Sequence, residues 1–317
     1  MDIARVISRR FLVPGLIILV LLILLATLPL YAPTYTPILL TTIFMYIVLT
    51  VSWAIFSGPT GYISLAPAAF FGVGVYASAL LGFTLPLPLI IIIGGLVSFI
   101  LALLIGALTL RLRGIYFAIF TFGLVELLRH FMMWWEVNIV GTTGRVIPIQ
   151  DNTTVYYGML VIFVILLLTA YIIRRSKFGL ALQSIGDNEE AAAHTGINVT
   201  ALKIITFAIS AFFMGAAGAI MATRWTYIDP RIAFDPLLSF MPVLMAIFGG
   251  MGQLYGPVIG GAIFAYLREF LTTEFPYYYM LIFGIIMVVV ILYLPNGLAG
   301  LVQKWQRRGS VGQQADT

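Results

Sequence analysis

The sequence predicts an all-α, polytopic helical membrane protein with about ten transmembrane helices and both termini in the cytoplasm. Of its 317 residues, 62% are hydrophobic and only 9% are charged, and the mean hydropathy is +1.08. No acidic or basic residue occurs between Phe11 and Leu110, a length of several spans of about 20 residues. The period-2 alternation of barrel strands is missing from these runs. Because backbone groups in lipid must be satisfied within the segment, helices are expected.

Proline, glycine and charged residues divide the apolar sequence into ten expected spans. The first apolar run is longer than the core of a usual signal peptide and no small-residue cleavage site follows it, which indicates a retained helix. The expected spans are about 11–30, 38–56, 62–82, 88–110, 114–133, 155–173, 203–223, 237–250, 256–272 and 277–295.

The distribution of basic residues supports this number of spans and gives their direction. With a cytoplasmic N-terminus and alternating spans, twelve of the 17 Lys and Arg residues lie on the cytoplasmic side. These twelve are Arg5, Arg9, Arg10, Arg111, Arg113, Arg174, Arg175, Lys177, Lys203, Lys304, Arg307 and Arg308. We therefore expect a cytoplasmic N-terminus (1–10), one transmembrane domain (11–303) with a cytoplasmic loop (174–202), and a disordered cytoplasmic tail (304–317). Residues 136–154 and 224–236 form two unusually polar outer loops.

Composition also excludes several functions. The net charge of +5 comes from basic residues beside the spans, which is a pattern of membrane orientation and not of nucleic-acid binding. The chain contains no cysteine, so disulfides and thiolate metal sites are excluded. His130 and His194 are expected on opposite sides of the membrane, so no histidine metal site and no bound cofactor is expected.

The polar segment from Ser176 to Asn198, called the island below, is the exception in this apolar chain. It holds three of the twelve acidic residues within four positions, Asp187, Glu189 and Glu190. The spacing of Asp187 and Glu190 fits a capping box at the start of a helix.

Three alanines then favour a helix from Asn188 to Thr195, and Gly196 suits the C′ position with Ile197 packing back. Such a helix is about 12 Å long and is too short to be stable alone, so it needs a surface to lie against.

Two interpretations of this helix remain open from the residues. It either caps its own bundle, or it is a coupling helix seated in a groove of a separate ATPase subunit. Ala192 and its neighbours would allow close seating, while Asp187 and Glu189 would make charge contacts at the rim. The G-x-x-x-x-G-K-[ST] motif does not occur in the chain, so any nucleotide hydrolysis must come from a partner.

Glycine and proline interrupt the third expected span. Small residues in membrane helices commonly serve close packing, and broken helices also line substrate paths near the middle of the membrane. The expected lining residues of such a path are Gly61, Ser64, Pro67, Phe71, Gly72 and Ser78. Two charged groups near outer span ends, Glu126 with Arg129 and His130, and Arg268 with Glu269, are interpreted as structural locks more than as functional sites.

The island is similar to the cytoplasmic loop of ABC-importer permeases, in particular the branched-chain amino acid permease family (LivM-type). Four further segments resemble this family and follow its order, so that the resemblance covers residues 57–300. They are SGPTGYISLAPAAFFGVGVYASALL from Ser57, RLRGIYFAIFTFGLVELLR from Arg111, KIITFAISAFFMGAAGAI from Lys203 and GGMGQLYGPVIGGA from Gly249. The chain departs from the family at Ala66-Pro67, at Gly186 where Arg is frequent, and in the thinner glycine content of residues 141–144.

The resemblance implies a permease subunit of an ATP-driven importer in the inner membrane of a prokaryote, and not an enzyme. Its substrates would be branched-chain or related hydrophobic amino acids. Its partners would be two cytoplasmic ATP-binding subunits, a homologous permease subunit and an extracytoplasmic substrate-binding protein. The residues implied in ATPase coupling are Gly186, Asp187, Asn188, Glu189, Glu190, Ala192 and Gly196.

Two other classes of protein were weighed against this one. An ion-coupled secondary transporter or channel for a small polar solute would need acidic residues in the middle of the membrane, and the sequence offers almost none. A membrane-embedded enzyme would need clustered catalytic residues, which the sequence also lacks.

Overall fold

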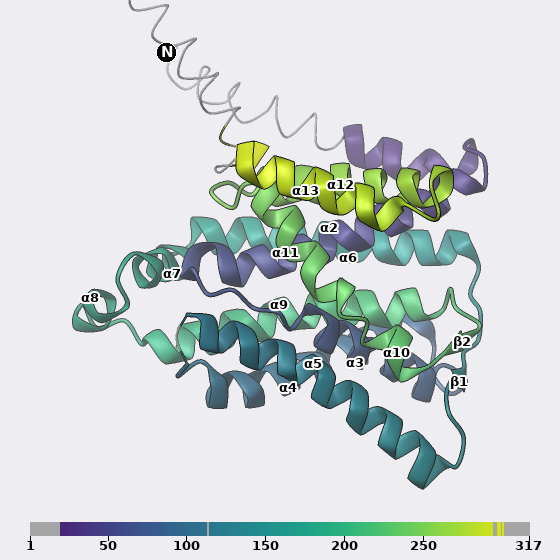
Figure 1. Cartoon of the computed structure of the whole chain (residues 1–317), viewed down its shortest axis with the longest axis horizontal. Helices are drawn as coiled ribbons and strands as arrows, with labels where there is room; N and C mark the ends of the chain where they lie inside the picture. The colour runs from purple at the N-terminus through teal and green to yellow at the C-terminus, as the bar shows by residue number, and fades with distance from the viewer. Residues whose placement is uncertain (1–19, 113, 294–296, 299, 301–317) are drawn as a thin grey trace, which may run out of the picture.

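The computed structural model describes residues 20–112, 114–293, 297–298 and 300. The expected cytoplasmic N-terminus, the first half of the first span and the tail from residue 304 lie outside the described residues. Within them, long helices run roughly along one axis, so that their connections gather at the two ends of the molecule (Figure 1).

The fold is all-α apart from one short pair of strands. The long helices are α2 (Tyr35–Thr60), α3 (Pro67–Leu81), α4 (Leu87–Thr109), α5 (Ile115–Trp135), α6 (Asn152–Arg175), α9 (Val199–Ala222), α11 (Leu237–Gly249), α12 (Tyr255–Glu274) and α13 (Tyr279–Tyr293). Short elements connect them: η1 (Leu28–Leu30), η2 (Glu136–Val140), α7 (Lys177–Asp187), α8 (Glu189–His194), α10 (Pro230–Ala233), β1 (Arg145–Val146) and β2 (Tyr227–Ile228).

Six helical stretches within the described residues are long and apolar enough to cross a membrane. They are Tyr35–Thr60, Leu87–Thr109, Ile115–Val140, Asn152–Arg175, Val199–Ala222 and Pro230–Gly249. The structure therefore supports a polytopic helical membrane protein. The expected third span corresponds to a shorter apolar helix, the 15-residue α3. The expected eighth span corresponds to the 13-residue α11, and α10 precedes that helix.

The expected helix over 62–82 begins only at Pro67, because residues 61–66 form no regular secondary structure. Gly61 ends α2 in the left-handed region with φ of 72°. Polar side chains then bind the backbone of this non-helical segment: Trp53 Nε1 donates to the carbonyl of Ser64 at 2.7 Å, and the Leu65 amide donates to Thr121 Oγ1 at 2.9 Å. Trp53 lies about 10 Å along α2 from its end. This 61–66 segment therefore turns back alongside α2, where non-helical backbone is tolerated only inside protein.

Helix α9 lies at the centre of the bundle and packs against α3 and α4 through small residues. A Cβ atom on Gly74 would lie 1.9 Å from the carbonyl oxygen of Gly215. A Cβ on Gly218 would lie 2.0 Å from the carbonyl oxygen of Phe71. Glycine is therefore required here for backbone-to-backbone contact, which is the packing role of small residues in membrane helices.

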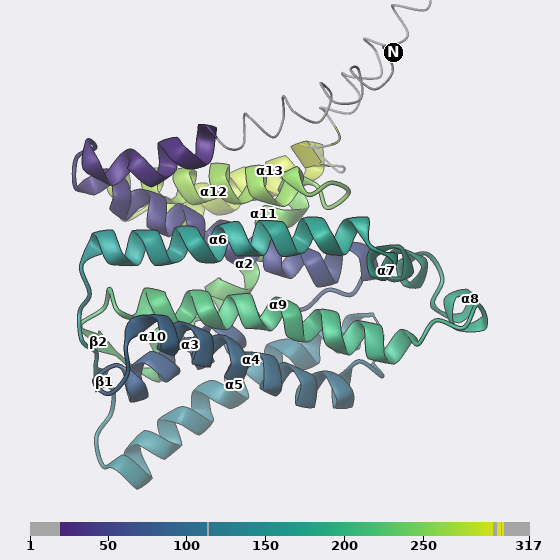
Figure 2. The same cartoon turned by 180° about the vertical axis from the view of Figure 1, so that it is seen from behind.

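The two polar regions of the sequence lie at opposite ends of the bundle. Helices α7 and α8 of the island project from one end, and β1 and β2 lie at the other (Figures 1 and 2). The strands pair antiparallel, with Arg145 opposite Ile228 and Val146 opposite Tyr227. This pairing joins the two expected polar outer loops, which are separated by α6, the island and α9 in the sequence.

Candidate functional site: the island and its contacts with the bundle

The island forms two helices, and its predicted capping box is wrong. Asp187 is the last residue of α7, and Asn188 is the N-cap of α8. Asn188 Oδ1 accepts from the amides of Glu190 and Ala191, each at 3.0 Å. Because Asn188 adopts an extended backbone (φ −158°, ψ 110°) between the two helices, the cap falls one residue later than the acid spacing indicated.

The predicted end of α8 is confirmed. Gly196 has a φ of 87°, and its amide donates to the carbonyl of Ala193 at 3.0 Å. The Ile197 amide donates to the carbonyl of Ala192 at 3.3 Å. These two bonds form a Schellman motif, in which the residue after the glycine packs back on the helix.

The island has a small hydrophobic core of its own. Buried side chains from α7, α8 and the start of α9 form it, with Ile197 packed against them: Leu182, Ile185, Ala192 and Val199. This core is the surface against which the short helix α8 lies. Burial between α7 and α9 stabilises α8, which is too short to be stable alone. Ala192 is 3% exposed and faces inward, contrary to the expectation that it seats a partner. The outward alanines of α8 are Ala191 and Ala193.

The island also touches the end of α2. A Cβ atom on Gly186 would lie 2.0 Å from the carbonyl oxygen of Pro59. The arginine that is frequent here in the family could not fit this approach. Gly186 therefore serves the packing of α7 on α2, in addition to any role at an exposed surface.

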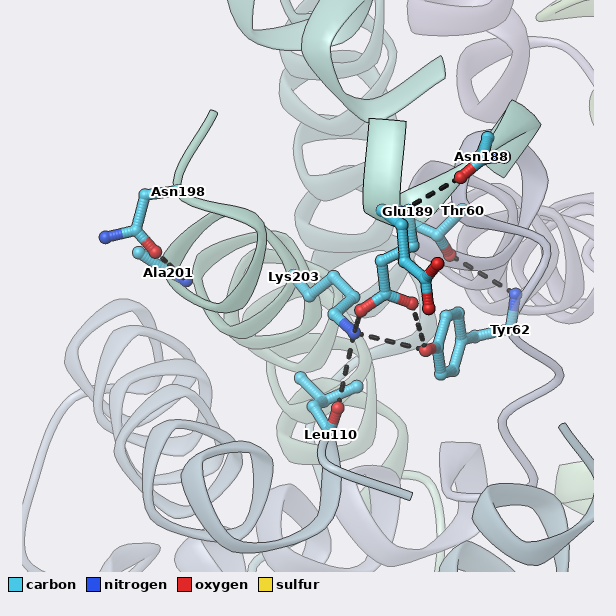
Figure 3. Close-up of polar contacts among 9 residues, drawn as sticks. Thr60, Tyr62, Leu110, Asn188, Glu189, Asn198, Ala201 and Lys203 are labelled. Atoms are coloured by element: carbon cyan, nitrogen blue, oxygen red, sulfur yellow. Dashed lines mark hydrogen bonds and ion pairs between the residues drawn. The ribbon is translucent and has the colours of Figure 1, made fainter. Parts of the chain in front are cut away.

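Glu189, the first residue of α8, points into the bundle and meets side chains from two other segments (Figure 3). Its Oε1 accepts from Lys203 Nζ at 2.7 Å, and its Oε2 accepts from the Tyr62 hydroxyl at 2.7 Å. The Lys203 ammonium also donates to the Tyr62 hydroxyl at 3.1 Å and to the carbonyl of Leu110 at 3.3 Å. The side chain of Lys203 is 2% exposed and that of Glu189 is 23% exposed.

This cluster differs from the sequence expectation in two ways. Glu189 was expected to make a charge contact at the rim of a partner groove, but its carboxylate is held by its own chain. Lys203 was counted only as a cytoplasmic charge that orients the membrane spans. One feature of the sequence could have indicated this pairing: Lys203 is a single lysine at the start of an apolar span. A lysine buried at such a position requires a charged partner nearby.

A cavity of about 360 Å³ lies beside α7. Its wall comes from the ends of α2 and α6 nearest the island, from α7 and from the loop between α11 and α12, and it includes Gly58, Arg174, Leu182, Asp187, Met251 and Leu254. Arg174 closes one side, because its Nη2 donates to the carbonyl of Gly252 at 2.6 Å. The glycine-rich loop after α11 is thereby tied to the beginning of the island.

Five of the six expected path residues of the third span are buried, and Gly61 is exposed. Ser64 is 3% exposed and Ser78 is fully buried, with its Oγ donating to the carbonyl of Ala219 at 2.5 Å. Pro67 and Phe71 are buried in α3. A Cβ on Gly72 would lie 2.4 Å from the ring of Phe234, so this glycine packs α3 against the end of α10. Gly61 ends α2. These residues thus lie in the 61–66 segment and in α3. Their role in a substrate path stays a prediction.

The charged groups that were expected near outer span ends make local contacts. Glu126 forms an ion pair with Arg129 one turn along α5, and His130 Nε2 lies 3.8 Å from the same carboxylate. The Arg268 guanidinium lies 5.4 Å from the ring centroid of Tyr46 and so links α12 to α2. These contacts agree with the interpretation as structural locks.

Sequence reasoning missed a buried acid at this outer end. Glu136 is fully buried and accepts from the Tyr76 hydroxyl at 2.9 Å and from the Gly144 amide at 2.8 Å. It therefore anchors the loop before β1 to α3. Its position directly after an apolar run made it resemble an ordinary loop acid.

The fold and the two polar ends define the class: a polytopic helical membrane protein with a folded, two-helix loop at one end of its bundle. The model of the family described as "branched-chain amino acid transport system / permease component" matches residues 35–291. The chain belongs to this family.

Curated relatives agree with that assignment. The chain is 28% identical to the high-affinity branched-chain amino acid transport system permease protein LivM of Salmonella typhimurium, over 86% of this chain and 72% of that protein. It is 26% identical to LivM of Escherichia coli, over 95% and 79%. It is 25% identical to the ribose import permease protein RbsC of Haemophilus influenzae, over 71% and 73%. No solved structure matches the chain significantly. The chain is a transport subunit and not an enzyme.

Proposed function

We propose that this chain is the membrane-spanning subunit of an ATP-driven importer for branched-chain or related hydrophobic amino acids. The observation that carries the proposal is the island: a folded, polar, two-helix unit at one end of an apolar bundle. The family supplies the substrate class, since the relatives over most of the chain are named for branched-chain amino acid transport. The chain would act in the inner membrane of a prokaryote.

The proposal is tested by reconstitution with the ATPase subunits, the second permease subunit and the binding protein in lipid vesicles. Uptake of leucine, isoleucine or valine is expected only with ATP hydrolysis. Uptake driven by an ion gradient in the absence of ATPase subunits would contradict it. Purification of the complex identifies whether the second permease subunit is a homologue, as we propose, or another copy of this chain.

We further propose that the ATPase docks on the outward face of α8 and the end of α7. Five of the seven residues expected in coupling are exposed there: Gly186, Asp187, Asn188, Glu190 and Gly196. Ala192 and Glu189 face inward and would contribute by holding α8 in place. A substitution at Ala192 would disrupt the island's core, so it cannot test docking.

Ala193→Trp is the sharper test of docking, because Ala193 is exposed beside the buried Ala192. This variant is expected to insert normally and to lose co-purification of the ATPase. Thr142→Trp, at an exposed position at the opposite end of the bundle, is the matched control and should keep the ATPase bound. A normal complex and full transport with Ala193→Trp would show that α8 only caps its own bundle.

The substrate path, we propose, runs beside the 61–66 segment and α3. Support comes from the non-helical backbone of residues 61–66, since non-helical segments at membrane depth commonly line solute sites. Ser64→Cys is expected to react with small aqueous thiol reagents in at least one nucleotide state of the transporter. Leu104→Cys is the control, because Leu104 is 61% exposed on the apolar flank of α4. Equal reactivity of both positions in every state would refute the path.

Ten spans with both termini in the cytoplasm also remain part of the proposal. Reporter fusions at Tyr31 and at Gln303 should report opposite sides of the membrane. The same side for both would require a different number of spans.

A further inference from the structure

Three chain segments and one helix end converge on the cluster around Lys203 (Figure 3). Glu189 begins α8, Lys203 lies in the first turns of α9, Tyr62 belongs to the 61–66 segment, and Leu110 follows the end of α4. We propose that Tyr62, Glu189 and Lys203 form a link that carries movement of α8 to the 61–66 segment and the start of α3. This inference rests on the proposed function and names the positioning residues through which the island would act.

The first step is that α8 and α9 are fastened to each other at this point. Lys203 has three donors, and three acceptors surround it: Glu189 Oε1, the Tyr62 hydroxyl and the Leu110 carbonyl. Its ammonium also lies 4.5 Å from the ring centroid of Tyr62. A buried ammonium cannot separate from its carboxylate without a large desolvation penalty. Displacement of α8 therefore pulls on Lys203 and Tyr62 together.

The second step is that the 61–66 segment can respond to such a pull. It begins at the left-handed Gly61 and forms no regular secondary structure. Between its two ends, side chains hold its backbone, among them Trp53, Thr60 and Thr121. At its end Pro67 begins α3, where the Ala68 amide donates to Ser239 Oγ of α11 at 3.1 Å. The segment therefore joins Tyr62 directly to the start of α3 and its contact with α11.

The third step concerns where the island touches the rest of the bundle. Beside α7 lies the cavity of about 360 Å³, which leaves space next to that helix. The close contact of α7 with α2 is at Gly186 and Pro59, three residues before Tyr62. Both the backbone contact and the charged cluster thus reach the bundle at residues 59–62. Movement of the island would therefore reach the start of the 61–66 segment by two contacts, in addition to its contacts with α6 and α9.

Tyr62→Phe tests the link with the smallest change. It removes the hydroxyl that joins Glu189 and Lys203, while the ring keeps its edge-on contact with Phe117 at 5.6 Å between centroids. Tyr157→Phe is the matched control, because it removes a hydroxyl that donates to the carbonyl of Ala26 at 3.0 Å, far from the island. Both variants are prepared as the whole transporter in lipid vesicles with the binding protein and leucine.

The measured quantity is the amount of leucine transported for each ATP hydrolysed. Tyr62→Phe is expected to keep the bound ATPase and its basal ATP hydrolysis, and to lower this ratio about fivefold or more. Tyr157→Phe should leave the ratio unchanged. A merely structural role of Tyr62 would instead lower yield and thermal stability while the assembled transporter kept a normal ratio, and that result would overturn the link.

Lys203→Met gives a second measurement from another segment of the cluster. It should lower the same ratio, and it decides the question if Tyr62→Phe does not assemble. A normal ratio in either assembled variant would overturn the link alone. Wild-type uptake of leucine without ATP hydrolysis would overturn the proposed function, and the link with it.

Discussion

The two halves of the buried ion pair should differ in their effect on stability. Glu189→Ala leaves the Lys203 ammonium, 2% exposed, with only two neutral acceptors, Tyr62 and Leu110. Breaking a fully buried pair costs about 3–5 kcal/mol. Because the site of Glu189 is 23% exposed and admits water, we reduce this to about 2–3 kcal/mol.

Lys203→Met should cost less. It leaves a carboxylate that is already in partial contact with solvent and that keeps the hydrogen bond from the Tyr62 hydroxyl. The methionine side chain also fills the apolar part of the site. We expect about 1 kcal/mol. The double variant should be destabilised by less than the sum of the two single effects, because Glu189 and Lys203 interact directly.

Thermal unfolding of the purified chain in detergent measures this difference. At about 2–4 °C for each kcal/mol, Glu189→Ala should unfold roughly 4–12 °C below the wild type. Lys177→Met, which removes an exposed lysine of α7, is the control and should change little. A larger effect of Lys203→Met than of Glu189→Ala, or two effects that simply add, would refute the reasoning.

Three further predictions concern packing, capping and the outer end. Gly74→Ala should sharply reduce the yield of folded protein, because its Cβ would lie 1.9 Å from a carbonyl oxygen of α9, whereas Gly123→Ala, with nothing within 4 Å, should be tolerated or stabilising. Asn188→Ala should destabilise the island by about 1 kcal/mol and speed amide exchange in α8, while Asp187→Ala should not; the reverse order would restore the capping box. Glu136→Leu leaves two donors without their acceptor and should increase protease cleavage of the loop before β1; unchanged cleavage would show that this loop is held by other contacts.

Properties that depend on composition and local spacing were predictable. The all-α membrane class follows from the hydrophobic runs, since no other backbone arrangement satisfies its hydrogen bonds in lipid without strand alternation. The end of α8 at Gly196 was also predictable, because a Schellman motif involves only neighbouring residues. The interruption of the third span was indicated by its glycine and proline content, although the start of its helix at Pro67 was not.

Properties that depend on which segments meet were decided only by the tertiary structure. The acid spacing placed the cap at Asp187, but the break between α7 and α8 makes Asn188 the cap. The helical pattern did not show which alanine of α8 would face α7, so Ala192 was assigned to the wrong face. From the sequence, Glu189 could not be distinguished from an ordinary surface acid. Only the fold shows that Lys203 and Tyr62 lie beside it. The pairing of a charge is set by the folding of distant segments, because its free energy depends on the burial and partners that those segments supply.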